Sequence, residues 1–228
     1  MTVYTHLDTE INQLKLDLLE MFNMVISQLD KAKESLINFD KDLAREVIFG
    51  EKRVNSFELK IDRDCENIFA LFQPVAVDLR FLLATLKINS NLERIGDIAE
   101  GIARFVIDIK LNPEPKLLET TRLLEMFDTS TSMLSDVREA FQNEDTTLAR
   151  SIFKKDEVLD EINLQAAIKV ADFIRAHNDR INQSLLVLSM IRKLERVGDQ
   201  SKNIAEEIIF YVEAKVLKHK SKAAKQNE

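Results

Sequence analysis

The amino-acid sequence predicts an all-α protein built as two tandem antiparallel three-helix bundles. The chain of 228 residues contains only four glycines and three prolines, too few for the frequent turns of a β-rich or Rossmann-like protein. Apolar residues make up 45% and charged residues 31%, a mixture typical of long amphipathic helices around a substantial core. In addition, the second half of the chain repeats the layout of the first.

Three helices are expected in the first half. Apolar residues recur at steps of four and three from Leu7 to Val25, which is the stripe of an amphipathic helix. That helix should end before Asp40, a suitable N-cap for a second helix over 41–72. Pro74 then interrupts the pattern and suits the start of a third helix over 75–109. The apolar stripe of this third helix is Ile88, Leu92, Ile95, Ala99, Ile102, Val106 and Ile109.

Two prolines, Pro113 and Pro115, stand almost at the midpoint of the chain and mark the boundary between the halves. A proline disfavours helical conformation in the residue before it, so this segment should be a connection. We therefore expect a first bundle over 1–111, a second bundle over 116–218 and a basic flexible tail over 219–228. The second bundle should contain helices over 116–143, 146–176 and 180–218.

Residue identities indicate an internal duplication. The run Leu92–Asp97, with the sequence LERIGD, reappears 102 residues later as LERVGD at Leu194–Asp199. Leu43–Arg45 reappears 105 residues later as Leu148–Arg150. Because the offset falls from 105 in the second helix to 102 in the third, the connection between these two helices is three residues shorter in the second half. Consecutive helical units with short connections are typical of antiparallel bundles.

The repeated run places two acidic residues four apart, Glu93 with Asp97 and Glu195 with Asp199. Residues at this spacing lie on one face of a helix, and two like charges there are unfavourable by a few tenths of a kcal/mol. Taken alone, each pair is most simply a solvated acidic face neutralised by the arginine within the same motif.

The preceding helix of each half carries a second pair at the same spacing, Glu51 with Asn55 and Asp156 with Asp160. Each pair lies as far before the hairpin turn as the acidic motif lies after it, so all four residues should be level across the two helices. Clustered oxygen ligands without histidine or cysteine suit a hard cation such as Mg²⁺, Mn²⁺, Ca²⁺ or Fe³⁺. The alternative is a set of helix–helix salt bridges through Lys52, Arg53 and Lys155.

One further position distinguishes the two sets. Asn203 offers an extra oxygen one turn after Asp199, whereas Gly101 stands at the equivalent position of the first half. A glycine inside a helix costs about 1 kcal/mol relative to alanine and permits close approach of another helix. The predicted ligands are Glu51, Asn55, Glu93 and Asp97 in the first set, and Asp156, Asp160, Glu195, Asp199 and Asn203 in the second. The first set is the weaker candidate for a metal site.

No catalytic residue is predicted. A di-iron bundle would need a Glu-x-x-His step, which none of the three histidines provides, and no glycine-rich phosphate-binding loop is present. Cys65 lies between Asp64 and Glu66, whose charges raise a thiol pKa and favour a structural role. One cysteine cannot form an internal disulfide, which fits a reducing cytosol.

Charge and hydropathy restrict location and partners. The net charge of −7 argues against nucleic-acid binding, which usually needs a basic face. No secretory signal is expected at the start of the chain, and the longest apolar stretch, 185–191, is far too short to cross a bilayer. The basic C-terminal lysines suit the macrodipole of a fraying helix end, with contact to an anionic membrane or acidic partner as the alternative. They are Lys215, Lys218, Lys220, Lys222 and Lys225.

The two copies of the LERIGD motif resemble the signature of the PhoU family of phosphate-uptake regulators. The resemblance extends from Met1 to about Lys218 and includes the runs KRVN at 52–55 and QPVAVDLR at 73–80. It implies a cytoplasmic, helical and often dimeric protein with two three-helix bundles, in which some members bind iron or other metals through these acidic motifs. Gly101 departs from the asparagine or aspartate that is common in the family.

The same resemblance implies a protein that acts by contact rather than by catalysis. Its expected partners are the ATPase subunit of the phosphate ABC importer and the sensor histidine kinase of the phosphate two-component system. It would hold phosphate-starvation genes off while phosphate is plentiful. Two alternatives remain open: an accessory protein of an ion-coupled phosphate carrier, and a metal-dependent hydrolase.

Overall fold

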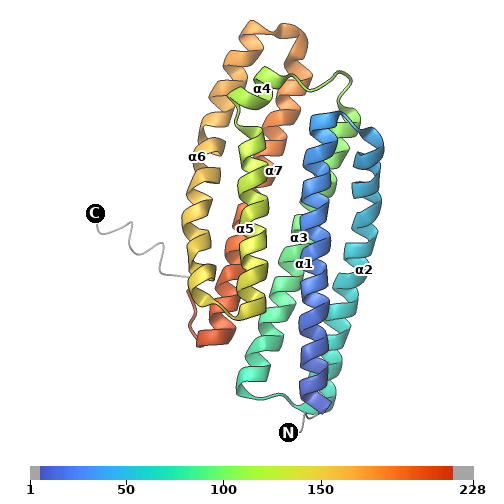
Figure 1. The fold of residues 1–228 in the computed structure, drawn as a ribbon, viewed down its shortest axis with the longest axis vertical. Coiled ribbons are helices and arrows are strands. Elements are labelled where there is room, and N and C mark those ends of the chain that lie inside the picture. The colour runs from blue at the N-terminus through green and yellow to red at the C-terminus, as the bar shows by residue number, and fades with distance from the viewer. Residues whose placement is uncertain (1–5, 218–228) are drawn as a thin grey trace, which may run out of the picture.

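The computed structural model describes residues 6–217 and confirms the all-α fold (Figure 1). The first half contains three long helices: α1 (His6–Asn38), α2 (Lys41–Phe72) and α3 (Ala76–Asp108). The second half contains α4 (Pro115–Thr120), α5 (Leu123–Asn143), α6 (Thr146–Ala176), the short 3₁₀ helix η1 (Asn178–Arg180) and α7 (Ile181–Glu213). No helix in the described range is long and apolar enough to span a membrane.

The two bundles lie side by side along their long axes (Figure 1). The halves meet where α3 packs against α7 and α1 packs against α5. Four aromatic rings mark the junction, one each from α1, α3, α5 and α7, with centroids 5.6–6.3 Å apart: Phe22, Phe81, Phe141 and Tyr211. The buried apolar residues of both halves form one continuous core. The division into units 1–111 and 116–218 stays a prediction.

The predicted apolar stripes form the core of the bundles. Leu14, Leu18, Met21 and Val25 of α1 are buried, and so is every residue of the stripe predicted for α3, from Ile88 to Ile109. The N-cap prediction is also confirmed, because Asp40 Oδ1 accepts hydrogen bonds from the amides of residues 42 and 43, both at 2.9 Å. Asp145 caps α6 in the same way.

Two helix predictions are wrong. The helix expected over 116–143 is divided, because Arg122 adopts a left-handed conformation with φ 55° between α4 and α5. Just before it, the buried hydroxyl of Thr121 donates to the carbonyls of Leu117 and Leu118. The ion pairs of Arg122 with Glu125 and Glu161 hold the turn.

The last helix is shorter than the predicted 180–218. It ends at Glu213, where Ala214 takes a left-handed φ of 55°. Lys215, expected in a fraying helix end, lies beyond the helix and pairs with Glu213 at 2.9 Å. The predicted tail 219–228, with Lys220, Lys222 and Lys225, and Lys218 before it, lie outside the described residues.

Candidate metal centre

The acidic motifs lie at mid-height on the third helix of each half, facing the helix that precedes it. α2 packs along α3, and α6 packs along α7. Within each predicted set the residues differ in burial. Glu51 and Asp156 are buried at 4% exposure each, and Glu93, Glu195, Asp199 and Asn203 are half-buried. Asn55, Asp97 and Asp160 are exposed.

The predicted ligands of the first half, Glu51, Asn55, Glu93 and Asp97, are called the first cluster, and those of the second half the second cluster. In the first cluster, Glu51 of α2 lies against the backbone of α3 at Gly96. A Cβ atom at Gly96 would be 2.7 Å from Glu51 Oε2, so only glycine leaves room for this carboxyl group. Gln28 Nε2 of α1 donates to Glu51 Oε2 at 3.2 Å. The other oxygen, Glu51 Oε1, is buried without a hydrogen-bond partner, and so is Gln28 Oε1. Two orphaned acceptor atoms therefore lie close together beneath the acidic surface.

The electrostatics of this cluster are dominated by carboxylates. The pKa of Glu51 is raised to about 7, chiefly by burial and in smaller part by the charges of Asp97, Glu100 and Glu93, while the Gln28 hydrogen bond opposes the rise. Burial and the neighbouring carboxylates Asp97 and Glu58 also raise the pKa of Glu93. Sequence reasoning missed Glu58 and Glu100, although Glu58 lies two helical turns after Glu51 and Glu100 lies two turns after Glu93.

The second cluster repeats this arrangement with one difference. A Cβ atom at Gly198 would be 2.5 Å from Asp156 Oδ1 and 2.6 Å from the Cδ1 atom of Leu159, so the second motif glycine also accommodates a carboxylate of the preceding helix. Here, however, Lys202 pairs with both Asp156 and Asp199, the latter at 2.8 Å. Burial raises the pKa of Asp156, and the hydrogen bond and charge of Lys202 reduce that rise without cancelling it.

Lys202 is the main residue of the site that sequence reasoning missed. Under the 102-residue offset its equivalent in the first half is Glu100, so the repeat itself contains a reversal of charge. That reversal was the available signal. Within the described residues, no ion pair joins Glu51, Glu93 or Asp97 to a basic side chain.

Asn203 and Gly101 belong to the contact between the halves. The Asn203 amide donates to Asn91 Oδ1 of α3 at 3.4 Å. Gly101 of α3 lies beneath the side chain of Lys193 from α7, whose Cε atom is 2.9 Å from the position of a Cβ at that glycine. Under the 102-residue offset Asn91 matches Lys193, and Gly101 matches Asn203. The halves therefore make the same contact twice with different side chains.

The donor chemistry fits a hard cation better in the first cluster than in the second. No group of three or more histidine, cysteine, aspartate or glutamate side chains converges as a metal site within residues 6–217. Each cluster has several carboxylates and a buried carboxylate oxygen without a hydrogen-bond partner, Glu51 Oε1 and Asp156 Oδ1, but the second already holds an ammonium group among its carboxylates. The assignment of the nine ligands stays a prediction.

The side chain of Cys65 is not suited to nucleophilic catalysis. Cys65 is fully buried, and burial with the nearby Asp62, Asp64 and Glu66 raises its pKa to about 12. The thiolate needed for nucleophilic chemistry is therefore disfavoured.

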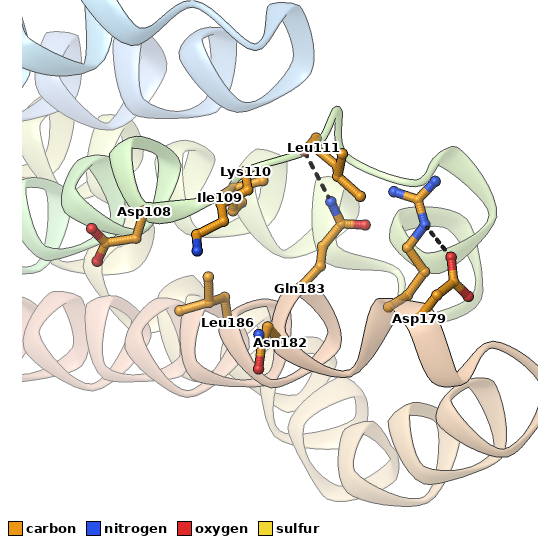
Figure 2. Close-up of a pocket in the computed structure, with 9 residues that line it drawn as sticks. Asp108, Ile109, Lys110, Leu111, Asp179, Asn182, Gln183 and Leu186 are labelled. Carbon is orange, nitrogen blue, oxygen red and sulfur yellow. Dashed lines mark hydrogen bonds and ion pairs between the residues drawn. The ribbon is translucent and has the colours of Figure 1, made fainter.

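A small pocket lies where the connection after α3 meets the start of α7 (Figure 2). There the Gln183 amide donates to the carbonyls of Leu111 and Asn112 and accepts from the Glu114 amide, which fixes the connection to α7. The pocket contains none of the nine predicted ligands.

Comparison with known proteins identifies the repeated unit. The family model described as "PhoU domain" matches the chain twice, at residues 18–106 and 123–208. The phosphate-specific transport system accessory protein PhoU of Escherichia coli is 33% identical over 212 residues, covering 93% of this chain and 87% of the relative. PhoU homolog 1 of Thermotoga maritima is 31% identical over 221 residues, covering 96% of this chain and 94% of the relative.

Solved structures agree with this result. The crystal structure of PhoU from Pseudomonas aeruginosa superposes with a TM-score of 0.85 at 29% identity and covers 91% of this chain and 99% of that chain. The phosphate transport system regulatory protein PhoU from Streptococcus pneumoniae superposes with a TM-score of 0.82 at 29% identity, covering 93% and 99%.

Proposed function

The chain belongs to the PhoU family, and on that premise we propose that it is a cytoplasmic negative regulator of phosphate uptake and phosphate-starvation signalling. It contacts the ATPase subunit of the phosphate ABC importer and the sensor histidine kinase, and it holds the kinase output low while phosphate is plentiful. The observation that carries the proposal is the match of two PhoU domains to relatives named as accessory proteins of the phosphate-specific transport system.

Action by contact with other proteins is supported by apolar side chains exposed at the surface. Apolar side chains are exposed at equivalent positions on the third helix of each half: Leu79 and Leu83 on α3, and Ile181 and Leu185 on α7, at 37–49%. Grouped apolar side chains at a surface are typical of protein contacts. We propose that such faces serve partner binding and homodimer formation.

We further propose that the first acidic cluster takes a hard cation: iron, manganese, magnesium or calcium. The support is the set of carboxylates around the orphaned Glu51 oxygen, because a nearby positive charge stabilises the ionised form of a buried carboxyl group and carboxylate oxygens suit a hard cation. A bound cation would supply that charge, while Glu51, Glu93 and Asp97 would hold it. Its proposed role is to set the docking surface by fixing α2 against α3.

The binding part is tested with the purified ATPase subunit and the cytoplasmic part of the kinase, each immobilised and exposed to this chain. Binding of both is expected, and Leu79→Ser with Leu83→Ser should weaken at least one interaction while leaving the helical content unchanged. The exposed polar double variant Lys154→Ser with Glu157→Ser on α6 is the matched control. Failure to bind either protein would contradict the proposal and favour an accessory protein of an ion-coupled carrier.

The hydrolase alternative has a separate test. Turnover of a phosphate ester with Mg²⁺ or Mn²⁺ is expected to be absent. Turnover that disappears in Asp97→Asn would overturn the contact mechanism.

A further inference from the structure

The second acidic cluster already contains a cation that belongs to the chain. Lys202 Nζ pairs with Asp156 across the α6–α7 interface and with Asp199 on its own helix. The Asp156 side chain is 5% exposed, and the Lys202 side chain is 25% exposed. The ammonium therefore lies between the two helices and is largely removed from solvent.

Helix geometry explains why this lysine reaches both carboxylates. Lys202 follows Asp199 by three residues, so both lie on the same side of α7. Gly198 lets Asp156 approach the backbone of α7 directly below. Asp156 is thus held between the glycine and the ammonium group, and the pairing offsets the cost of burying its charge.

The lysine also affects the remaining carboxylates of this cluster. Its charge opposes the rise in the Glu195 pKa that burial, Asp199, Asp160 and Asp156 produce. In turn, its hydrogen bonds with Asp156 and Asp199 raise the pKa of Lys202 above its usual value, against the effect of burial.

The first cluster has the opposite charge at the position equivalent to Lys202. Glu100 adds a carboxylate there, and its own ion pair is with Arg104, one turn further along α3, at 2.6 Å. The three predicted acidic ligands of this cluster, Glu51, Glu93 and Asp97, have no ion pair in the described structure. The second cluster therefore contains one built-in counter-ion, which pairs with two of its carboxylates, and the predicted acidic ligands of the first cluster have none.

We propose that Lys202 is the built-in cation of the second cluster, so that an added metal ion is taken up by the first cluster alone. The restriction to one cluster rests on the proposed metal binding, whereas the counter-ion role of Lys202 does not. The restriction reverses the order in which Asn203 and Gly101 ranked the two clusters as metal sites, because the charge at positions 100 and 202 outweighs one amide ligand.

Titration of the metal-free protein with Mn²⁺ tests the restriction, with bound metal counted by electron paramagnetic resonance. Asp97→Asn should abolish binding in the otherwise unchanged chain, and Asp199→Asn should leave the bound Mn²⁺ per chain unchanged. Lys202→Met should add a second set of bound Mn²⁺, and the exposed-lysine control Lys154→Met should not. Loss of Mn²⁺ in Asp199→Asn, or no gain in Lys202→Met, would overturn the restriction.

A second measurement judges Lys202 without any metal. In chelator-treated buffer, Lys202→Met should lower the equilibrium constant for folding by about tenfold or more, because it leaves a buried carboxylate unpaired. Adding Asp156→Asn should recover most of that loss. If Lys202→Met leaves the folding equilibrium unchanged, the counter-ion role is wrong. If Lys202→Met destabilises the fold and Asp156→Asn restores it, but the unmodified chain binds no Mn²⁺, the metal-binding proposal fails while the role of Lys202 stands.

Discussion

Alanine substitutions at two mid-helix glycines should change stability in opposite directions. Alanine is favoured over glycine inside a helix by about 1 kcal/mol. At Gly198 the new Cβ would meet Asp156 Oδ1 at 2.5 Å and Leu159 Cδ1 at 2.6 Å. Neither neighbour can move easily, because Asp156 is paired with Lys202 and Leu159 is fully buried. Overpacking costs about 1–3 kcal/mol, and two contacts this short place the cost at about 2–3 kcal/mol. After the helix-propensity gain of about 1 kcal/mol, Gly198→Ala should lose about 1–2 kcal/mol net.

At Gly101 the same substitution meets only the far end of Lys193, a flexible side chain that can turn toward solvent. Gly101→Ala should therefore gain about 0.5–1 kcal/mol. Urea unfolding measures both changes, and with a slope of about 2 kcal/mol per molar the two midpoints should differ by roughly 0.7–1.5 M. Stabilisation by Gly198→Ala equal to that by Gly101→Ala would refute the packing argument.

Three further variants test the electrostatics and the helix ends by urea unfolding in chelator-treated buffer. The folded-state pKa of Glu51 is raised to about 7, so its stabilising contribution is present below the unfolded value of about 4.3 and is lost as pH rises through 7. Glu51→Gln should remove that pH dependence and be more stable than the unmodified chain at pH 8 by about 3–4 kcal/mol; parallel pH profiles would contradict this. Asp145→Ala should cost about 1 kcal/mol by removing the α6 cap, and an unchanged midpoint would show that the cap is dispensable. Gln73→Gly should gain about 1 kcal/mol, because Gln73 is exposed with a left-handed φ of 47°; a loss would mean that its side chain contributes to the turn.

The helices were predictable because their signals are local. The stripe from Ile88 to Ile109 has the period of a helix, and Asp40 and Pro74 mark ends by well-understood chemistry. The break at Arg122 was not predictable, since neither Thr121 nor Arg122 is a typical helix breaker. The left-handed turn there is accompanied by an ion pair between Arg122 and a different helix, α6, which the local sequence does not encode.

The site was predictable in its symmetry and less so in its chemistry. Spacing alone identified Glu51 and Asp156 as facing the repeated motifs, and the structure brings each against its motif glycine. Whether Lys202 points to solvent or across to α6 depends on the rotation of α7 about its axis, which the helical period of the sequence leaves open. The contact of Asn203 with Asn91 likewise depends on how the two halves pack.

Regulation of phosphate signalling is most directly tested by a phosphatase reporter in the organism that encodes this chain. The gene is deleted, then restored, and reporter output is measured in phosphate-rich medium. High output after deletion that falls on restoration is the predicted result, since the protein is proposed to hold the kinase output low. Output that stays low after deletion would contradict negative regulation through the kinase.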